Sequence, residues 1–280
     1  MIYNEYASIG ANQLAYVRQN EWNEDVILFF HGFTGSKGYF PELPDNESCI
    51  ISFDRPGVGE SSVIEYYSME NFLKNVYDVL KSHDVKTISL IGHSAGGYYA
   101  QVFAQMFPDI VRTLTLVSSM IPLNCPKTKK TVNSFWKFIT FFVLNAKGIS
   151  RCYFSKMSKN IQKDYNKQLT ENMNKISDIE KKFIEENPEL IKNSTLNAVA
   201  NDGAGVCYDA YALCQKREKV EISENITIYI WQGTADDMVP VSFLDYYKAE
   251  YKIKEIHMIE NVGHMLYLPY WANIIEEVCR

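Results

Sequence analysis

The 280-residue sequence contains no apolar run approaching the roughly 20 residues that a membrane-spanning helix needs. Its first ten residues have neither a basic start nor an apolar stretch, so they do not have the pattern of a secretory signal. We therefore expect a cytoplasmic protein. The six cysteines lie far apart without C-x-x-C spacing, which predicts reduced and mostly structural thiols.

Motifs of metal and nucleotide chemistry are also missing. The sequence has no H-E-x-x-H, no cluster of Cys and His, and no P-loop lysine motif, so we predict neither a metal nor another cofactor. Gly57 and Gly59 superficially fit a dinucleotide fingerprint, but its third glycine is absent. The formal net charge of −6 disfavours nucleic acid and an anionic membrane surface as partners. The expected partner is a small-molecule substrate.

The most informative segment that is present is I-S-L-I-G-H-S-A-G-G at residues 88–97. An apolar, strand-like run breaks there at a G-x-S-x-G motif and continues with helical spacing. A sharp strand-to-helix turn needs small residues at Gly92 and Gly96, because side chains there would collide with the neighbouring strand and helix. The turn pushes Ser94 out into solvent. The motif arises by chance in about one chain in ten of this size, but this context predicts that Ser94 is a nucleophile.

A serine nucleophile needs a general base, and the chain has five histidines. His264 lies in a loop between the strand-like residues 255–259 and Pro269, where a last helix is expected. A histidine on such a loop can place its ring over a nearby turn more freely than one inside a strand or helix. Taken alone, His264 is most simply a surface residue. The presence of Ser94 makes it the predicted base.

The acid that orients the base is expected at the end of another strand, before the histidine. The strand-like residues 226–231 open into a loop that contains Asp236 and Asp237. One of the two should accept the Nδ1–H of His264 and stabilise the imidazolium. The other should cap the turn or a helix that starts near Val241.

Strand-like and helical segments alternate along most of the chain. A hairpin over residues 3–18 is followed by the predicted strands 26–30, 49–53, 87–91, 112–118, 226–231 and 255–259, with helices over 68–83 and 95–107. This alternation predicts a mostly parallel sheet with helices on both faces and a site beyond the carboxyl ends of the strands.

Residues 119–222 interrupt this alternation. No strand is evident there and apolar residues recur at helical intervals, which predicts an inserted cap of three to five helices between core segments 1–118 and 223–280. The charges of residues 155–186 should form a solvated helix face.

An aromatic helix is expected within this cap, over residues 131–144. It is apolar around nearly its whole circumference and should be covered on more than one side. Its aromatic side chains either wall an apolar substrate pocket or pack the cap against the core. The candidates for the pocket wall are Phe135, Trp136, Phe138 and Phe142.

The chain order of Ser94, Asp236 and His264 resembles the α/β-hydrolase superfamily, and more closely its serine-dependent, capped, esterase-like members. The segment H-G-F-T-G-S at 31–36 is similar to the family's loop after the third strand, which implies an oxyanion hole formed by the backbone N–H groups of Phe33 and Ala95. The acid loop G-x-x-D-x-x-V-P favours Asp236 over Asp237.

Two further segments carry the resemblance. The D-x-x-G-x-G-x-S pattern at 54–61 is similar to a segment after the fourth strand whose role in the family is structural. The G-x-G-x-x-x-D pattern at 203–209 looks like the family's return from cap to core. Together these matches imply an eight-stranded type of sheet with a helical cap.

The resemblance implies hydrolysis of small to medium carboxylic esters through an acyl-enzyme on Ser94. Alternatives with the same triad are a proline iminopeptidase-like aminopeptidase, a C–C bond hydrolase and a thioesterase. The aminopeptidase would need a cap carboxylate for the substrate ammonium, and the sequence does not place Glu185 or Glu186. A non-catalytic ligand-binding role is disfavoured because every catalytic group is present. The oligomeric state stays open.

Overall fold

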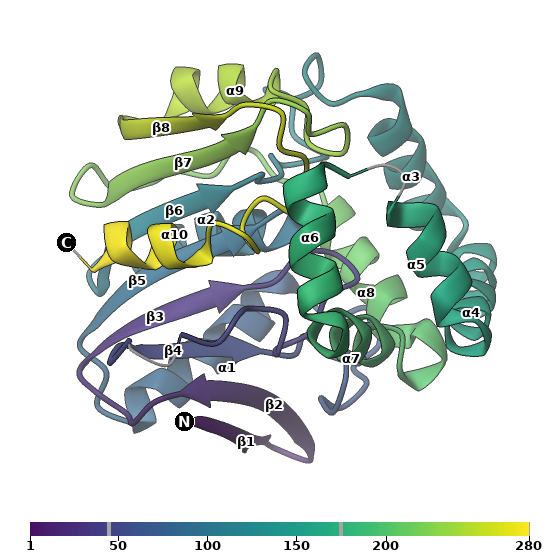
Figure 1. The fold of residues 1–280 in the computed structure, drawn as a ribbon, viewed down its shortest axis with the longest axis horizontal. Coiled ribbons are helices and arrows are strands. Elements are labelled where there is room, and N and C mark those ends of the chain that lie inside the picture. Colours follow the sequence, from purple (N-terminus) through teal and green to yellow (C-terminus); the bar gives the residue numbers. More distant parts are fainter. Residues whose placement is uncertain (44–45, 174–175, 280) are drawn as a thin grey trace.

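One eight-stranded sheet forms the centre of the computed structural model, which describes residues 1–43, 46–173 and 176–279 (Figure 1). The strands are β1 (Ile2–Ile9), β2 (Asn12–Gln19), β3 (Asp25–Phe30), β4 (Cys49–Phe53), β5 (Thr87–His93), β6 (Val111–Val117), β7 (Thr227–Gly233) and β8 (Ile253–Ile259). Their order is β1-β2-β4-β3-β5-β6-β7-β8. Only the β1–β2 and β2–β4 pairs are antiparallel, so the predicted, mostly parallel sheet is confirmed.

Helices cover both faces of the sheet, as predicted (Figure 1). Side chains alternate along each strand, so Leu28 and Phe30 of β3 belong to one apolar cluster and Ile27 and Phe29 to another. Burial on both faces explains why this strand is a continuous apolar run. The first cluster also contains residues of α1 (Met69–Ser82), α2 (Ala95–Met106) and α9 (Phe243–Glu250), and the second contains residues of α10 (Trp271–Val278).

The cap lies beyond the carboxyl ends of the parallel strands (Figure 1). Its helices are α3 (Ser134–Asn145), α4 (Lys147–Lys163), α5 (Tyr165–Met173), α6 (Asp178–Glu186), α7 (Pro188–Ala198), the 3₁₀ turn η1 (Asn201–Gly203) and α8 (Ala204–Cys214). Six α-helices therefore lie within the predicted insertion, so the expected three to five is too few. Neighbouring helices are separated by as little as one residue, and such short breaks leave little trace in hydrophobic periodicity.

None of the helices in the described ranges is both long and apolar enough to cross a membrane.

Candidate active site

Ser94 lies at the turn between β5 and α2, with φ 52° and ψ −123°. A Cβ atom at Gly92 would lie 2.5 Å from Gly97 Cα, and one at Gly96 would lie 1.9 Å from the carbonyl oxygen of Phe30. Both positions therefore require glycine, as predicted, and the surrounding backbone holds the serine in its uncommon conformation. The expectation that Ser94 is pushed into solvent is wrong, because its neighbours leave it only 6% exposed.

Three loops bring the predicted triad together. His264 Nε2 lies 2.9 Å from Ser94 Oγ, and His264 Nδ1 lies 2.9 Å from Asp236 Oδ2 and 3.1 Å from Oδ1. The serine follows β5, the aspartate follows β7 and the histidine follows β8. The carboxylate accepts the Nδ1–H, which leaves Nε2 unprotonated and able to accept the serine proton.

Asp236 holds its own loop as well as the histidine. Its Oδ1 accepts the backbone N–H groups two and three residues further on, at 3.0 and 2.8 Å. Burial opposes ionisation, but His264 and the backbone donors outweigh it, so the pKa of Asp236 is lowered. Asp237 is exposed and bonds to no residue that the structure describes. The expectation that it caps the turn or the next helix is wrong, because Asp236 caps the turn and Ser242 precedes α9.

His93, at the end of β5 and directly before Ser94, contacts the backbone of the predicted base, His264. Its Nε2 lies 2.9 Å from the backbone oxygen of His264, and its ring centroid lies 4.3 Å from that of Tyr267. Burial, with a smaller contribution from His264, lowers the pKa of His93 to about 3. The neutral ring therefore donates its Nε2–H to the His264 carbonyl and fixes the backbone of the predicted base. No pattern in the sequence indicates this bond.

The two predicted oxyanion donors face no competing acceptor. Neither the N–H of Phe33 nor that of Ala95 donates to a residue within the described ranges. Ala95 is the first residue of α2, where N–H groups have no partner inside the helix. Thr34 adopts φ 59°, which is rare for a β-branched residue, so the Phe33 loop is strained.

Arg55 holds this strained loop in place. Its guanidinium donates to the carbonyl oxygens of His31 at 2.8 Å and Gly32 at 2.7 Å, and it pairs with Asp209 of α8 at 3.0 Å. Arg55 and Asp209 are both 1% exposed. Arg55, from the segment with an expected structural role, thus joins the predicted oxyanion loop to Asp209, from the segment expected to return the chain from the cap to the core.

Glu180 of α6 lies next to the predicted triad, although we predicted that the charges of residues 155–186 form a solvated helix face. For Glu180 that prediction is wrong. This residue is fully buried, and its carboxylate accepts the backbone N–H groups of Gly263 at 3.0 Å and Met265 at 2.7 Å. These two residues flank His264. The same carboxylate accepts the backbone N–H of Ser177 at 2.8 Å. The S-x-x-E pattern signals this helix cap, but no local pattern reports the contact with the histidine loop.

We predict that Glu180→Gln lowers kcat by about 10- to 100-fold with KM nearly unchanged. The amide would direct an N–H group toward the N–H of Gly263 or Met265, and the displaced loop would misplace the base. Ser177→Ala is the matched control, since it removes the capping hydroxyl but keeps the carboxylate. Steady-state kinetics and thermal midpoints of both variants test the prediction. Equal losses of stability with an unchanged kcat would contradict it.

The predicted pocket residues of α3 do not share one environment. Phe135 and Phe138 are 56% and 62% exposed, which argues against a place in an enclosed pocket. Trp136 is buried, and its Nε1 lies 3.5 Å from the carbonyl oxygen of Met238 in the acid loop. Phe142 is half-buried beside Phe138. A pocket role therefore stays a prediction for Trp136 and Phe142.

Phe154 of α4 is a pocket candidate that the sequence did not indicate. Its side chain is 4% exposed, and its ring meets the ring of Phe33 edge to face at 6.2 Å between centroids. Because the backbone N–H of Phe33 is a predicted oxyanion donor, this contact joins a cap side chain to the side chain of a predicted site residue.

Among the described residues, one group has the composition of a metal site. Potential ligand atoms of Glu255, His257 and Glu277 lie within 4.8 Å of one another. His257 Nε2 already lies 2.6 Å from Glu277, which also accepts the indole N–H of Trp231 at 2.8 Å. These bonds satisfy His257 Nε2 and the Glu277 carboxylate without an ion.

Comparison with known proteins shows the family to which this fold belongs. Residues 25–269 match the family model described as alpha/beta hydrolase fold. The chain is 32% identical to monoacylglycerol lipase abhd6-B of Xenopus laevis over 122 residues, covering 40% of this chain and 36% of that protein. It is 31% identical to a serine hydrolase-like protein of Danio rerio over 100 residues, covering 33% and 30%. These matches span about a third of each relative.

The same architecture occurs in solved structures. The enol-lactonase from Burkholderia xenovorans LB400 superposes with a TM-score of 0.66 at 14% identity, covering 98% of both chains. At this identity the likeness concerns the fold alone.

Proposed function

Because this chain belongs to the alpha/beta hydrolase fold family, we propose that it is a serine hydrolase that cleaves small to medium carboxylic esters through an acyl-enzyme on Ser94. The observation that carries the proposal is the continuous set of hydrogen bonds from Ser94 through His264 to Asp236. Geometry of this kind activates a serine hydroxyl on many unrelated folds.

The proposed reaction has two similar halves. His264 Nε2 takes the Ser94 proton while Oγ attacks the ester carbonyl, and the N–H groups of Phe33 and Ala95 hold the resulting oxyanion. The imidazolium then protonates the leaving alcohol, and the carbonyl re-forms as the acyl-enzyme. Water repeats the sequence and releases the acid. Asp236, which is ionised because its pKa is lowered, stabilises the imidazolium in both halves.

Two observations favour ester over aminoacyl substrates. The name of the Xenopus relative describes an ester-cleaving protein. An aminopeptidase would need a free cap carboxylate, but Glu180 is occupied by the N–H groups of Gly263 and Met265, and Glu185 and Glu186 are exposed.

Side-by-side assays with p-nitrophenyl esters, aminoacyl amides and acyl thioesters test the proposed substrate class. We expect the highest kcat/KM with the esters. A clear preference for amides or thioesters would replace the ester assignment without affecting the triad.

The contact between Phe154 and Phe33 predicts a role in acyl-chain selection. We expect Phe154→Ala to change the ratio of kcat/KM for short and long acyl esters by about tenfold. The loss of one apolar pocket contact typically changes the discrimination between such substrates by about this factor. Phe138→Ala is the control, since its side chain is exposed. Both variants should still react with a serine-directed phosphonate. An unchanged ratio in the Phe154 variant would place the acyl pocket elsewhere in the cap.

A further inference from the structure

Charge is distributed very unevenly along this chain. Between residues 127 and 163 there are nine lysines and arginines and no aspartate or glutamate. The rest of the chain has 19 basic and 34 acidic residues, a net charge of −15. The whole-chain charge of −6 is therefore the sum of a basic segment with a charge of +9 and a remainder with a charge of −15. At physiological salt, a charge interacts strongly only with partners within about 8 Å, because ions screen it at longer range. The net charge of the docking surface, and not that of the whole chain, therefore governs its electrostatic attraction to a partner.

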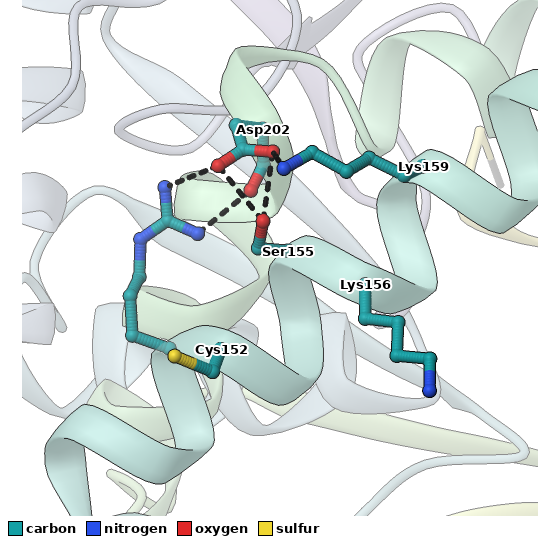
Figure 2. Close-up of a pocket in the computed structure, with 6 residues that line it drawn as sticks. Cys152, Ser155, Lys156, Lys159 and Asp202 are labelled. Carbon is teal, nitrogen blue, oxygen red and sulfur yellow. Dashed lines mark hydrogen bonds and ion pairs between the residues drawn. The ribbon is translucent and has the colours of Figure 1, made fainter.

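Five of the nine cations are free to meet an external anion. The side chains of Lys129, Lys130, Lys137, Lys156 and Lys163 are exposed and form no ion pair with any residue in the described part of the chain. Figure 2 shows Lys156 pointing away from Asp202, while Lys159 points toward it. Asp202 pairs with both Lys159, at 3.3 Å, and Arg151, at 3.5 Å, so even this shared acid leaves an excess of positive charge.

The same segment exposes large apolar side chains. Phe135, Phe138 and Phe141 follow one another every three residues on α3, and each is more than half exposed. Half-buried Phe142 contacts both Phe138 and Tyr153 of α4, with ring centroids 6.1 and 6.3 Å apart. We call Phe135, Phe138, Phe141, Ile149 and Tyr153 the apolar ridge; all five are 55–68% exposed.

The described part of the chain does not cover this ridge. A helix that is apolar all round is normally enclosed, and we expected α3 to be covered on more than one side. The structure buries only Trp136 and Val143 of α3 and leaves its outer side open. The outer side of α3 and α4 also faces away from the sheet (Figure 1). An apolar surface of this kind marks an interaction site.

We propose that the apolar ridge and the five unpaired lysines of the same segment dock this protein on a lipid surface with anionic headgroups. Helices with aromatic side chains among lysines lie in the interface of such a surface, where the rings enter the acyl boundary and the cations meet the headgroups. This proposal differs from our expectation that the net charge of −6 disfavours an anionic membrane surface, because the net charge does not show that the basic residues are concentrated in one segment.

Other occupants fit the surface less well. A symmetric pair of chains joined through this face would bring two copies of the same basic segment together, and their repulsion opposes such a dimer. Nucleic-acid strands bind in basic grooves lined with stacking rings, whereas the ridge lies on the outside of the cap and includes the aliphatic Ile149.

Docking at this face would bring the lipid close to the acid loop. Trp136, between the ridge residues Phe135 and Phe138, contacts the backbone of Met238, two residues after Asp236. The side chains of Met238 and Val241 in that loop are also exposed. The helix that carries three of the ridge residues therefore lies next to the loop that carries the catalytic acid.

Vesicle sedimentation of the full chain tests the proposal. Ether-linked phosphatidylcholine is used with and without an equal share of ether-linked phosphatidylglycerol, because these lipids contain no acyl ester and binding is read without hydrolysis. We expect binding to the anionic vesicles to exceed binding to neutral ones at least tenfold, and to weaken strongly between about 0.1 and about 1 M salt.

Matched variants locate the contact. Lys137→Glu with Lys156→Glu should reduce the partition coefficient at least tenfold, whereas Lys81→Glu with Lys86→Glu, which changes the net charge equally outside the segment, should not. Phe138→Ser with Phe141→Ser should reduce binding similarly at unchanged charge.

Three outcomes would overturn the proposal. They are equal binding to both vesicle types, equal loss in both lysine pairs, and binding to single-stranded RNA or self-association that displaces vesicle binding. None of these measurements depends on catalysis by Ser94, so the proposed hydrolase function can fail or succeed independently.

Discussion

Ser94→Ala is expected to lower turnover of a p-nitrophenyl ester by about 10⁴- to 10⁶-fold, because no other group in the described site can form the acyl-enzyme. The substitution removes the hydroxyl that lies 2.9 Å from His264 Nε2 but retains the His93 bond that holds the base. The fold should therefore survive, and KM should change far less than kcat. Steady-state kinetics with a thermal unfolding curve on the same preparation measure both.

Covalent labelling makes this prediction specific to the residue. A serine-reactive phosphonate should add once to the unaltered chain, at Ser94, and peptide mass spectrometry should find no adduct in the Ala variant. An adduct on another residue, or an active Ser94→Ala protein with a native thermal transition, would refute the nucleophile assignment.

The triad could be predicted because each member follows a strand. Strands that are buried on both faces appear as short apolar runs, and parallel strands bring their carboxyl ends to one edge. Ser94 and Asp236 follow two such runs, β5 and β7, and His264 follows the half-exposed edge strand β8, so the sequence positions of all three already implied a meeting point. The glycines at 92 and 96 added a steric requirement that the structure confirms, because a Cβ atom at either position would lie only 2.5 or 1.9 Å from a neighbouring backbone atom.

The contacts between the cap and the core could not be predicted in this way. Glu180 lies in a segment whose spacing is that of an exposed helix, and only the three-dimensional position of α6 turns its carboxylate toward the histidine loop. The exposure of Phe135 and Phe138 is the opposite case, because their composition alone predicts burial. Periodicity describes one element at a time and does not report which neighbour, if any, covers it.

The two adjacent aspartates show how the structure bears on a choice that, in the sequence, rested on the resemblance of the acid loop. Asp236 lies beneath His264, is nearly fully buried and accepts two backbone N–H groups, whereas Asp237 is exposed. The lowered pKa of Asp236 keeps it ionised at neutral pH. The choice between them can therefore be tested with a pair of isosteric substitutions.

Asp236→Asn should lower turnover by about 10⁴-fold, whereas Asp237→Asn should leave it nearly unchanged. The amide introduced by Asp236→Asn can still accept the backbone N–H groups through its oxygen, but its NH₂ group favours the wrong tautomer of His264, with Nε2 protonated and unable to accept the Ser94 proton. Phosphonate labelling of Ser94 should slow in parallel with turnover, because both reactions need the activated hydroxyl. The reverse ranking of the two variants would transfer the role to Asp237, and equal small losses would mean that an acid from another strand orients the histidine.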